Sequence, residues 1–265
     1  MTSSANDLRP VTLVAIGAVE QALRLARGRV GAADITAKNG RDLVTATDVA
    51  VEDAVRAAMG SLVIGEERGG EAPLDGAPYW LVDPICGTRN FASGVPLYSV
   101  NLAFVEGGQV TVAVVGDPST DEIHVAERGG GAWAVKDGAR RKLETSEESR
   151  TIVVEDGKAT GARRERAAQF TAAAIRADRW HFRSLGTTLA LSYVGAGRVS
   201  AYVLFWASAI HTAAGTLLAT EAGGTLSDVD GRPWTIHSDS VIVSATADLH
   251  QELLDLARSA SDGPR

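Results

Sequence analysis

The chain of 265 residues is 45% hydrophobic with a formal net charge of −7, which favours a folded globular protein and argues against a non-specific nucleic-acid binder. Its single cysteine, Cys86, cannot form an internal disulfide, as is typical of a reducing compartment. Charged residues interrupt the apolar pattern near the N-terminus, so we expect neither a signal peptide nor a membrane span there. The composition therefore predicts a cytoplasmic protein without membrane contacts.

Helices and antiparallel strands are predicted in the first part of the chain. Apolar periodicity predicts amphipathic helices over residues 11–29 and 48–59, the second capped by Thr47 or Asp48. Short buried strands are expected at 61–67 and 80–84, each ending in acidic residues. Two further strands flank a Gly-Gly turn within 100–118, and a hairpin turning at Asp-Gly is expected within 131–146.

Strands and helices alternate in the second part. The expected strands are 151–156, 180–186, 199–205 and 240–245, and the expected helices are 163–177, 187–197, 211–224 and 249–258. A Gly-Gly pair at the end of the third helix is a strong C-cap signal. These patterns predict a layered α/β protein with an N-terminal α+β part, 1–148, and a C-terminal α/β part, 149–265, packed as one compact unit.

Acidic residues follow two of the predicted strands. Glu66 and Glu67 come after the strand VIG, and Asp83 comes after the strand WLV. Loops at strand ends are common places for sites in α/β proteins. The Gly87-Thr88 step next to Asp83 could open a short helix whose N–H groups attract phosphate. Carboxylates beside such a turn suggest Mg²⁺ bridging the protein to a phosphate.

Several motifs resemble one known family. The segments KNGRDLVTATD, VIGEE, WLVDPICGTRNF, FRSLGTT and HTAAGTLLATEAGG, in that order, are similar to those of the inositol monophosphatase-like metal-dependent phosphatases. The resemblance extends over residues 11–258 and implies a layered α/β/α/β/α sandwich. It also implies a homodimer that uses Mg²⁺ to hydrolyse phosphate monoesters of small molecules, with no nucleic-acid partner.

The resemblance assigns roles to individual positions. Glu66, Asp83 and the backbone carbonyl of Ile85 match the family's metal ligands. Asp48 and Thr88 match the residues that orient the attacking water. Gly87 and Thr88 match the turn that meets phosphate. One Mg²⁺ site is therefore expected to be intact.

Three positions depart from the family pattern. The family has metal-binding aspartates where this chain has Cys86 and His211, and many members have a substrate-binding acid where it has Leu204. Two of the three carboxylates at one metal position are thus replaced, which is expected to degrade that position because Mg²⁺ prefers anionic oxygen. Leu204 and the nearby Trp206 would make the substrate side more apolar.

The altered pair has more than one interpretation. Cys86 and His211 could bind Zn²⁺ as softer ligands, or could act as a nucleophile and its base. By family analogy both would lie at helix N-termini, which should lower the pKa of Cys86 and keep His211 neutral. Cys86 could also be a small buried apolar residue, and His211 a helix cap.

Three functions follow from these interpretations. The first is a metal-assisted hydrolase of a small phosphorylated metabolite, with a degraded second metal site. The second is a different enzyme on the same fold that uses Cys86 and His211 on a more apolar substrate. The third is a catalytically inactive binding relative. An enzyme, and the first of the three, is favoured.

Overall fold

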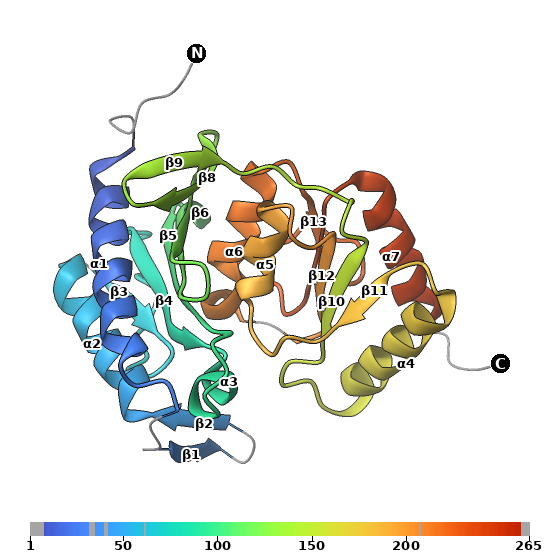
Figure 1. The fold of residues 1–265 in the computed structure, drawn as a ribbon, viewed down its shortest axis with the longest axis horizontal. Helices are drawn as coiled ribbons and strands as arrows, with labels where there is room; N and C mark the ends of the chain where they lie inside the picture. The colour runs from blue at the N-terminus through green and yellow to red at the C-terminus, as the bar shows by residue number, and fades with distance from the viewer. Residues whose placement is uncertain (1–7, 32–34, 40–41, 61, 207, 261–265) are drawn as a thin grey trace.

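The computed structural model describes residues 8–31, 35–39, 42–60, 62–206 and 208–260, which form five layers (Figure 1). Helices α1 and α2 cover one face of a seven-stranded sheet, and α5 and α6 lie between that sheet and a five-stranded one. Helices α4 and α7 cover the outer face of the second sheet. The helices are α1 (Pro10–Arg27), α2 (Ala46–Met59), α3 (Thr88–Ala92), α4 (Gly161–Ala177), α5 (Leu189–Gly195), α6 (Ala209–Glu221) and α7 (Ala247–Ser259). The predicted α/β/α/β/α sandwich is confirmed.

The first sheet is mostly antiparallel. Its order is β3-β4-β5-β6-β7-β8-β9, and only the β3–β4 pair is parallel. The strands are β3 (Val63–Gly65), β4 (Tyr79–Cys86), β5 (Ser99–Glu106), β6 (Gln109–Asp117), β7 (Glu122–Glu127), β8 (Gly131–Lys136) and β9 (Ala139–Lys142). Because β3 and β4 run in the same direction, the residues that follow β3 lie next to the end of β4, where the candidate site forms.

The second sheet has the order β11-β10-β12-β14-β13 and mixes both directions. Strand β10 is parallel to β11 and β12, whereas β14 is antiparallel to β12 and β13. The strands are β10 (Thr151–Glu155), β11 (His181–Arg183), β12 (Ala201–Leu204), β13 (Thr225–Ser227) and β14 (Val241–Ser244), and a separate hairpin consists of β1 (Ile35–Asn39) and β2 (Asp42–Thr45). The chain passes from the first sheet to the second between β9 and β10.

Most predicted elements are present, with some differences. The cap of α2 is Thr45 rather than Thr47 or Asp48, because Asp48 lies inside the helix and bonds back to the Thr45 N–H. Strands β1, β2, β7 and β13 were not predicted. In β7 the polar residue His124 occupies a buried position, where it bonds to Glu122, so the strand lacks a simple apolar alternation. None of the helices in the described ranges is long and apolar enough to cross a membrane.

Helix α1 packs very closely on the first sheet at Gly116 of β6. A Cβ atom at Gly116 would lie 2.6 Å from Val19 Cγ1 and 2.8 Å from Leu23 Cδ1, both on α1. Val19 and Leu23 belong to the buried core between α1, α2 and the sheet. The absent side chain therefore sets how near the helix approaches the strand.

We predict that Gly116→Ala lowers the free energy of unfolding by about 1–3 kcal/mol, because the added methyl group overpacks the interface with α1. Denaturant titration would measure it. Gly17→Ala is the matched control: Gly17 lies on the exposed face of α1, with nothing within 4 Å of an added Cβ. It should raise stability by about 0.5–1 kcal/mol. Equal effects of the two substitutions would contradict this account of the packing.

Candidate metal and phosphate site

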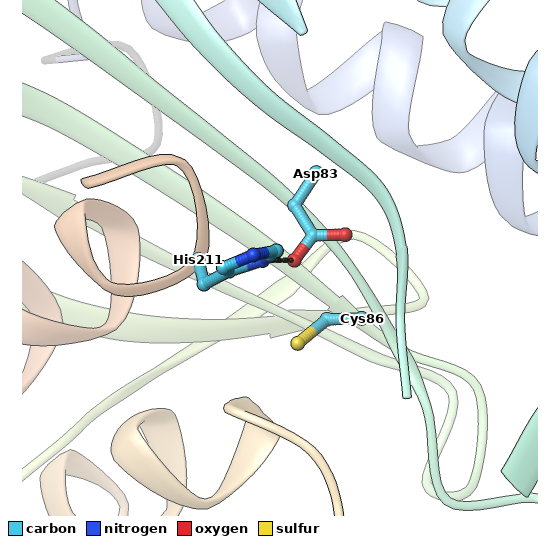
Figure 2. Close-up of side chains that lie close together, drawn as sticks. All are labelled: Asp83, Cys86 and His211. Carbon is cyan, nitrogen blue, oxygen red and sulfur yellow. Dashed lines mark hydrogen bonds and ion pairs between the residues drawn. The ribbon is translucent and has the colours of Figure 1, made fainter. Parts of the chain in front are cut away.

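Asp83 of β4 meets His211 in the first turn of α6 (Figure 2), and Glu66 lies close to His211. Asp83 lies near the end of β4, and Glu66 follows β3 directly. His211 Nδ1 lies 2.8 Å from Asp83 Oδ2, and His211 Nε2 lies 3.9 Å from Glu66 Oε1. Glu66 and Asp83, the two acidic metal ligands expected from the sequence, are therefore brought together, and His211 lies beside them.

A β-bulge in β4 brings Cys86 to the same place. Asp83 is paired with Asn101 of β5 and Cys86 with Ser99, so three steps along β4 match two along β5. In a regular strand, residues three apart point to opposite faces, and one extra residue reverses this. Ligand atoms of Asp83, Cys86 and His211 consequently lie within 4.8 Å of one another.

Hydrogen bonds from Thr188 hold the Cys86 sulfur. The Thr188 N–H donates to Sγ at 3.2 Å, and the Thr188 hydroxyl lies 2.8 Å from Sγ. The same hydroxyl donates to the carbonyl oxygen of His211 at 2.8 Å. The single hydroxyl hydrogen of Thr188 is therefore donated to His211, and the Thr188 oxygen accepts a hydrogen bond from the Cys86 thiol. This arrangement fits a protonated sulfur.

The expected thiolate at Cys86 is wrong for this structure. Burial raises the pKa of Cys86 well above its ordinary value, and the negative charge of Asp83 adds to the rise. Cys86 is the last residue of β4, and the helix that follows, α3, has only five residues. A helix this short has too few aligned peptide dipoles to offset the desolvation of a buried thiolate.

The pKa of His211 also shifts in the direction opposite to the one expected from the helix N-terminus. Burial alone would lower the pKa of His211, but the hydrogen bond to Asp83 and the charges of Asp83 and Glu66 outweigh it and raise the pKa. His211 does lie in the first turn of α6, as expected. The two nearby carboxylates decide the direction because they lie closer to the ring than most of the helix dipole.

Glu66 and Asp83 lie close enough for ionisation of one carboxyl to disfavour ionisation of the other. Burial and the neighbouring Asp83 raise the pKa of Glu66 to about 8. Asp83 is fully buried, and its Oδ1 atom has no hydrogen-bond partner among the described residues. Such groups are usually paired or coordinated, so this position favours a cation.

Thr88 lies between the Asp48 carboxylate and the Ile85 carbonyl. Its hydroxyl oxygen is 3.2 Å from Asp48 Oδ1 and 3.1 Å from the Ile85 oxygen, two acceptors for one hydrogen. Burial raises the pKa of Asp48 to about 6.

Gly87 precedes Thr88 with φ of +101°, and an added Cβ would lie 3.0 Å from the Leu97 oxygen, so this turn requires glycine.

The predicted substrate residues Leu204 and Trp206 have different environments. Leu204 is only 4% exposed and belongs to the core between α5, α6 and the second sheet, so its side chain is not available for substrate contact. Trp206 is partly exposed, and Lys158 Nζ lies 5.8 Å from the centroid of its ring. Lys158 Nζ is also 3.9 Å from Glu66 Oε1, which places Trp206 and Lys158 beside the acids.

Sequence reasoning did not identify Lys158, Thr188 or Glu52 as parts of the site. Thr188 lies within the FRSLGTT segment that carries the family resemblance, but its bond to Cys86 spans 102 positions. Lys158 follows β10 in a loop without a motif. Glu52 and Arg56 are four positions apart on α2, and this spacing in the sequence indicates an ion pair. It does not indicate that Glu52 supports the turn next to Glu66.

Buried Glu52 fixes the turn that carries Glu66. Its carboxylate accepts hydrogen bonds from the Glu67 N–H (2.7 Å), the Arg68 N–H (3.0 Å) and Arg56 Nε (2.9 Å). A Cβ at Gly65 would lie 2.1 Å from Glu52 Oε1, so glycine makes room for the carboxylate. The backbone on both sides of Glu66 is thereby held in place.

The five-layer sandwich, with buried Asp83 and half-buried Glu66 at adjacent strand ends, defines a member of the metal-dependent phosphatase superfamily. Residues 7–262 match the inositol monophosphatase family, and the chain belongs to this family, which confirms the resemblance. It is 33% identical over 221 residues to an inositol-1-monophosphatase of Mesorhizobium japonicum, covering 81% of this chain and 83% of the relative. It is 34% identical over 256 residues to a histidinol-phosphatase of Mycobacterium tuberculosis, with 91% and 95% covered. The structure of an IMPase from Thermotoga maritima superposes with a TM-score of 0.79 at 28% identity, covering 94% and 96%.

We predict that Glu52→Gln lowers the free energy of unfolding by about 1–3 kcal/mol, because one amide cannot replace a carboxylate that accepts three hydrogen bonds. It should also weaken Mg²⁺ binding, since Glu66 loses its support. Denaturant titration and calorimetry would measure the two effects. Asp53→Asn is the matched control: this residue pairs with Arg68 at the surface and should change neither quantity appreciably.

Proposed function

We propose that this protein is a Mg²⁺-dependent phosphatase acting on a phosphate monoester of a small metabolite. The supporting observation is the pair of carboxylates formed by fully buried Asp83 and half-buried Glu66, with one Asp83 oxygen lacking a hydrogen-bond partner among the described residues. Family membership and relatives named as phosphatases support the same reaction class.

The donor set at this position fits Mg²⁺. Glu66, Asp83 and the carbonyl of Ile85 would hold the ion, and all three offer the hard oxygen ligands that Mg²⁺ prefers. When bound, Mg²⁺ would polarise a phosphoryl oxygen and stabilise charge that develops on it. Cys86 and His211 offer sulfur and nitrogen instead, so they do not fit a second Mg²⁺.

The chain's own residues would position the attacking water. Thr88 would orient it, and Asp48 would accept its proton through the Thr88 hydroxyl. The water oxygen bonds to phosphorus as the bond from phosphorus to the ester oxygen breaks, and the proton that Asp48 accepted is released to solvent, which protonates the leaving alcohol oxygen. The Gly87-Thr88 turn would contact the phosphate, and glycine is needed there because an added Cβ would lie 3.0 Å from the Leu97 oxygen.

The substrate's alcohol part would lie against Trp206 and Lys158. In this chain the family's acid at this side is replaced by buried Leu204, so no carboxylate from that position meets substrate hydroxyls. Trp206 offers a ring face, and Lys158 offers a positive charge next to it. This combination favours an alcohol with an apolar face or an anionic group over a polyol.

In contrast to the phosphatase hypothesis, the use of Cys86 and His211 as nucleophile and base is not favoured by the observed contacts. The Cys86 sulfur bonds to Thr188, and His211 Nδ1 bonds to Asp83. A general base must reach the proton that it removes. In this arrangement each member of the pair already has another partner.

We predict that Mg²⁺ supports phosphate release from at least one monoester in a panel that includes inositol and histidinol phosphates. Glu66→Gln should reduce this rate at least about 100-fold, because it removes a charged metal ligand. The exposed Glu71→Gln should leave the rate unchanged. An absence of turnover with every monoester in wild-type protein, or equal rates in both variants, would contradict the proposal.

We further predict that Trp206→Ala raises the KM of the preferred monoester about 2- to 10-fold with a smaller change in kcat, since an aromatic contact contributes about 0.5–1.5 kcal/mol. Trp133→Ala is the matched control, because Trp133 also lies under a cation, with Arg140 Cζ 4.5 Å from its ring centroid on β8 and β9. Steady-state kinetics would separate KM from kcat. A KM that responds equally to both substitutions would argue against substrate contact.

A further inference from the structure

We propose that Asp83, Cys86 and His211 form a second cation site in this protein, and that this site binds Zn²⁺ or a similar transition metal in preference to Mg²⁺. The inference deepens the proposed function by adding a second metal to the same site. It rests on the proposed function only for the role of that metal, which would be to hold a water or a phosphate oxygen. The binding itself rests on the three side chains.

The three residues converge from separate elements. Asp83 and Cys86 are brought to one face by the bulge in β4, and His211 reaches them from the first turn of α6 (Figure 2). Their ligand atoms lie within 4.8 Å of one another. Tetrahedral zinc with bonds of about 2.0–2.3 Å needs ligand atoms roughly 3.3–3.8 Å apart, so small shifts of the side chains are needed, including a separation of His211 Nδ1 from Asp83 Oδ2, which lie 2.8 Å apart.

The donor types select the metal. One oxygen, one sulfur and one nitrogen donor make a poor site for Mg²⁺, which takes oxygen ligands and keeps much of its water. Zn²⁺ binds all three donor types. Catalytic zinc sites use three protein ligands and leave the fourth position open, and three is the number present here.

Two further features point to a ligand at this position. The Oδ1 atom of fully buried Asp83 has no hydrogen-bond partner among the described residues, so this carboxylate keeps an unused acceptor beside the site. The Thr188 N–H points at the Cys86 sulfur at 3.2 Å, where it would stabilise a metal-bound thiolate. Partners of this kind orient metal ligands and tune their affinity.

The alternative is that the site needs no metal. The hydrogen bond of 2.8 Å between His211 Nδ1 and Asp83 Oδ2 would then take the place of the cation, with Cys86 as a packing residue. A bound metal would instead separate these two atoms and take a lone pair from each. The two cases differ in whether Cys86 and His211 contribute to metal affinity.

Cobalt binding to the metal-stripped full-length protein tests the proposal. We expect a near-ultraviolet thiolate-to-cobalt charge-transfer band that saturates at one equivalent and is lost when Zn²⁺ is added. Cys86 is the only cysteine, so a thiolate band must come from it. X-ray absorption of the zinc-loaded wild type should show one sulfur neighbour at about 2.3 Å, a measurement that needs no variant.

Variants assign the ligands. Cys86→Ser should remove the cobalt band. Cys86→Ser and His211→Gln should each weaken Zn²⁺ binding at least about 100-fold, which is more than the loss of a residue that only hydrogen-bonds to a ligand usually causes. His250→Gln is the matched control, because His250 is buried on α7 and bonds to Ser227. It should leave Zn²⁺ affinity unchanged.

Two results would overturn the proposal: no thiolate band and no sulfur neighbour in wild type, or equal Zn²⁺ affinity in wild type and Cys86→Ser.

Glu66→Gln separates this proposal from the phosphatase proposal, since it should abolish phosphate release but keep the cobalt band. A band without turnover of any monoester in the wild type would contradict the phosphatase proposal alone. Turnover with Mg²⁺ but no band would contradict the second site alone.

Discussion

The contact between His211 and Asp83 links helix α6 to the first sheet at the point where buried negative charge has to be balanced. Asp83 is fully buried at the end of β4, and Glu66 is near enough for the two carboxylates to repel. An imidazole 2.8 Å from Asp83 partly relieves that repulsion, and the raised pKa of His211 follows from it. The structure around the acids is therefore organised to accommodate positive charge, whether from a proton or from a metal.

Backbone irregularities create this arrangement. The bulge in β4 turns Cys86 toward Asp83, and the positive φ of Gly87 lets the chain leave the strand for α3. On the neighbouring strand, Gly65 admits the Glu52 carboxylate that holds the turn after Glu66. Each of these features interrupts regular pairing at a strand end, where an interruption disturbs the sheet least and can redirect a side chain.

The chain keeps the family's architecture while the chemistry of one metal position differs. Relatives that cover most of its length, and a solved structure with a TM-score of 0.79, share the fold. The all-oxygen position at Glu66 and Asp83 is compatible with Mg²⁺, whereas Cys86 and His211 place softer donors beside it. Leu204 is withdrawn into the core, while Lys158 lies 3.9 Å from Glu66 and over the ring of Trp206.

The sequence by itself determined the layered α/β class, most helices and hairpins, and the positions of the acids, because these depend on local periodicity and on contiguous motifs. It also singled out Cys86 and His211, although they are 125 positions apart. Only the tertiary structure decided the direction in which their pKa values shift, since burial of Cys86 and the carboxylates around His211 outweigh the helix ends that the sequence suggested. The roles of Thr188, Lys158 and Glu52 likewise depend on contacts between distant segments, which no local pattern encodes.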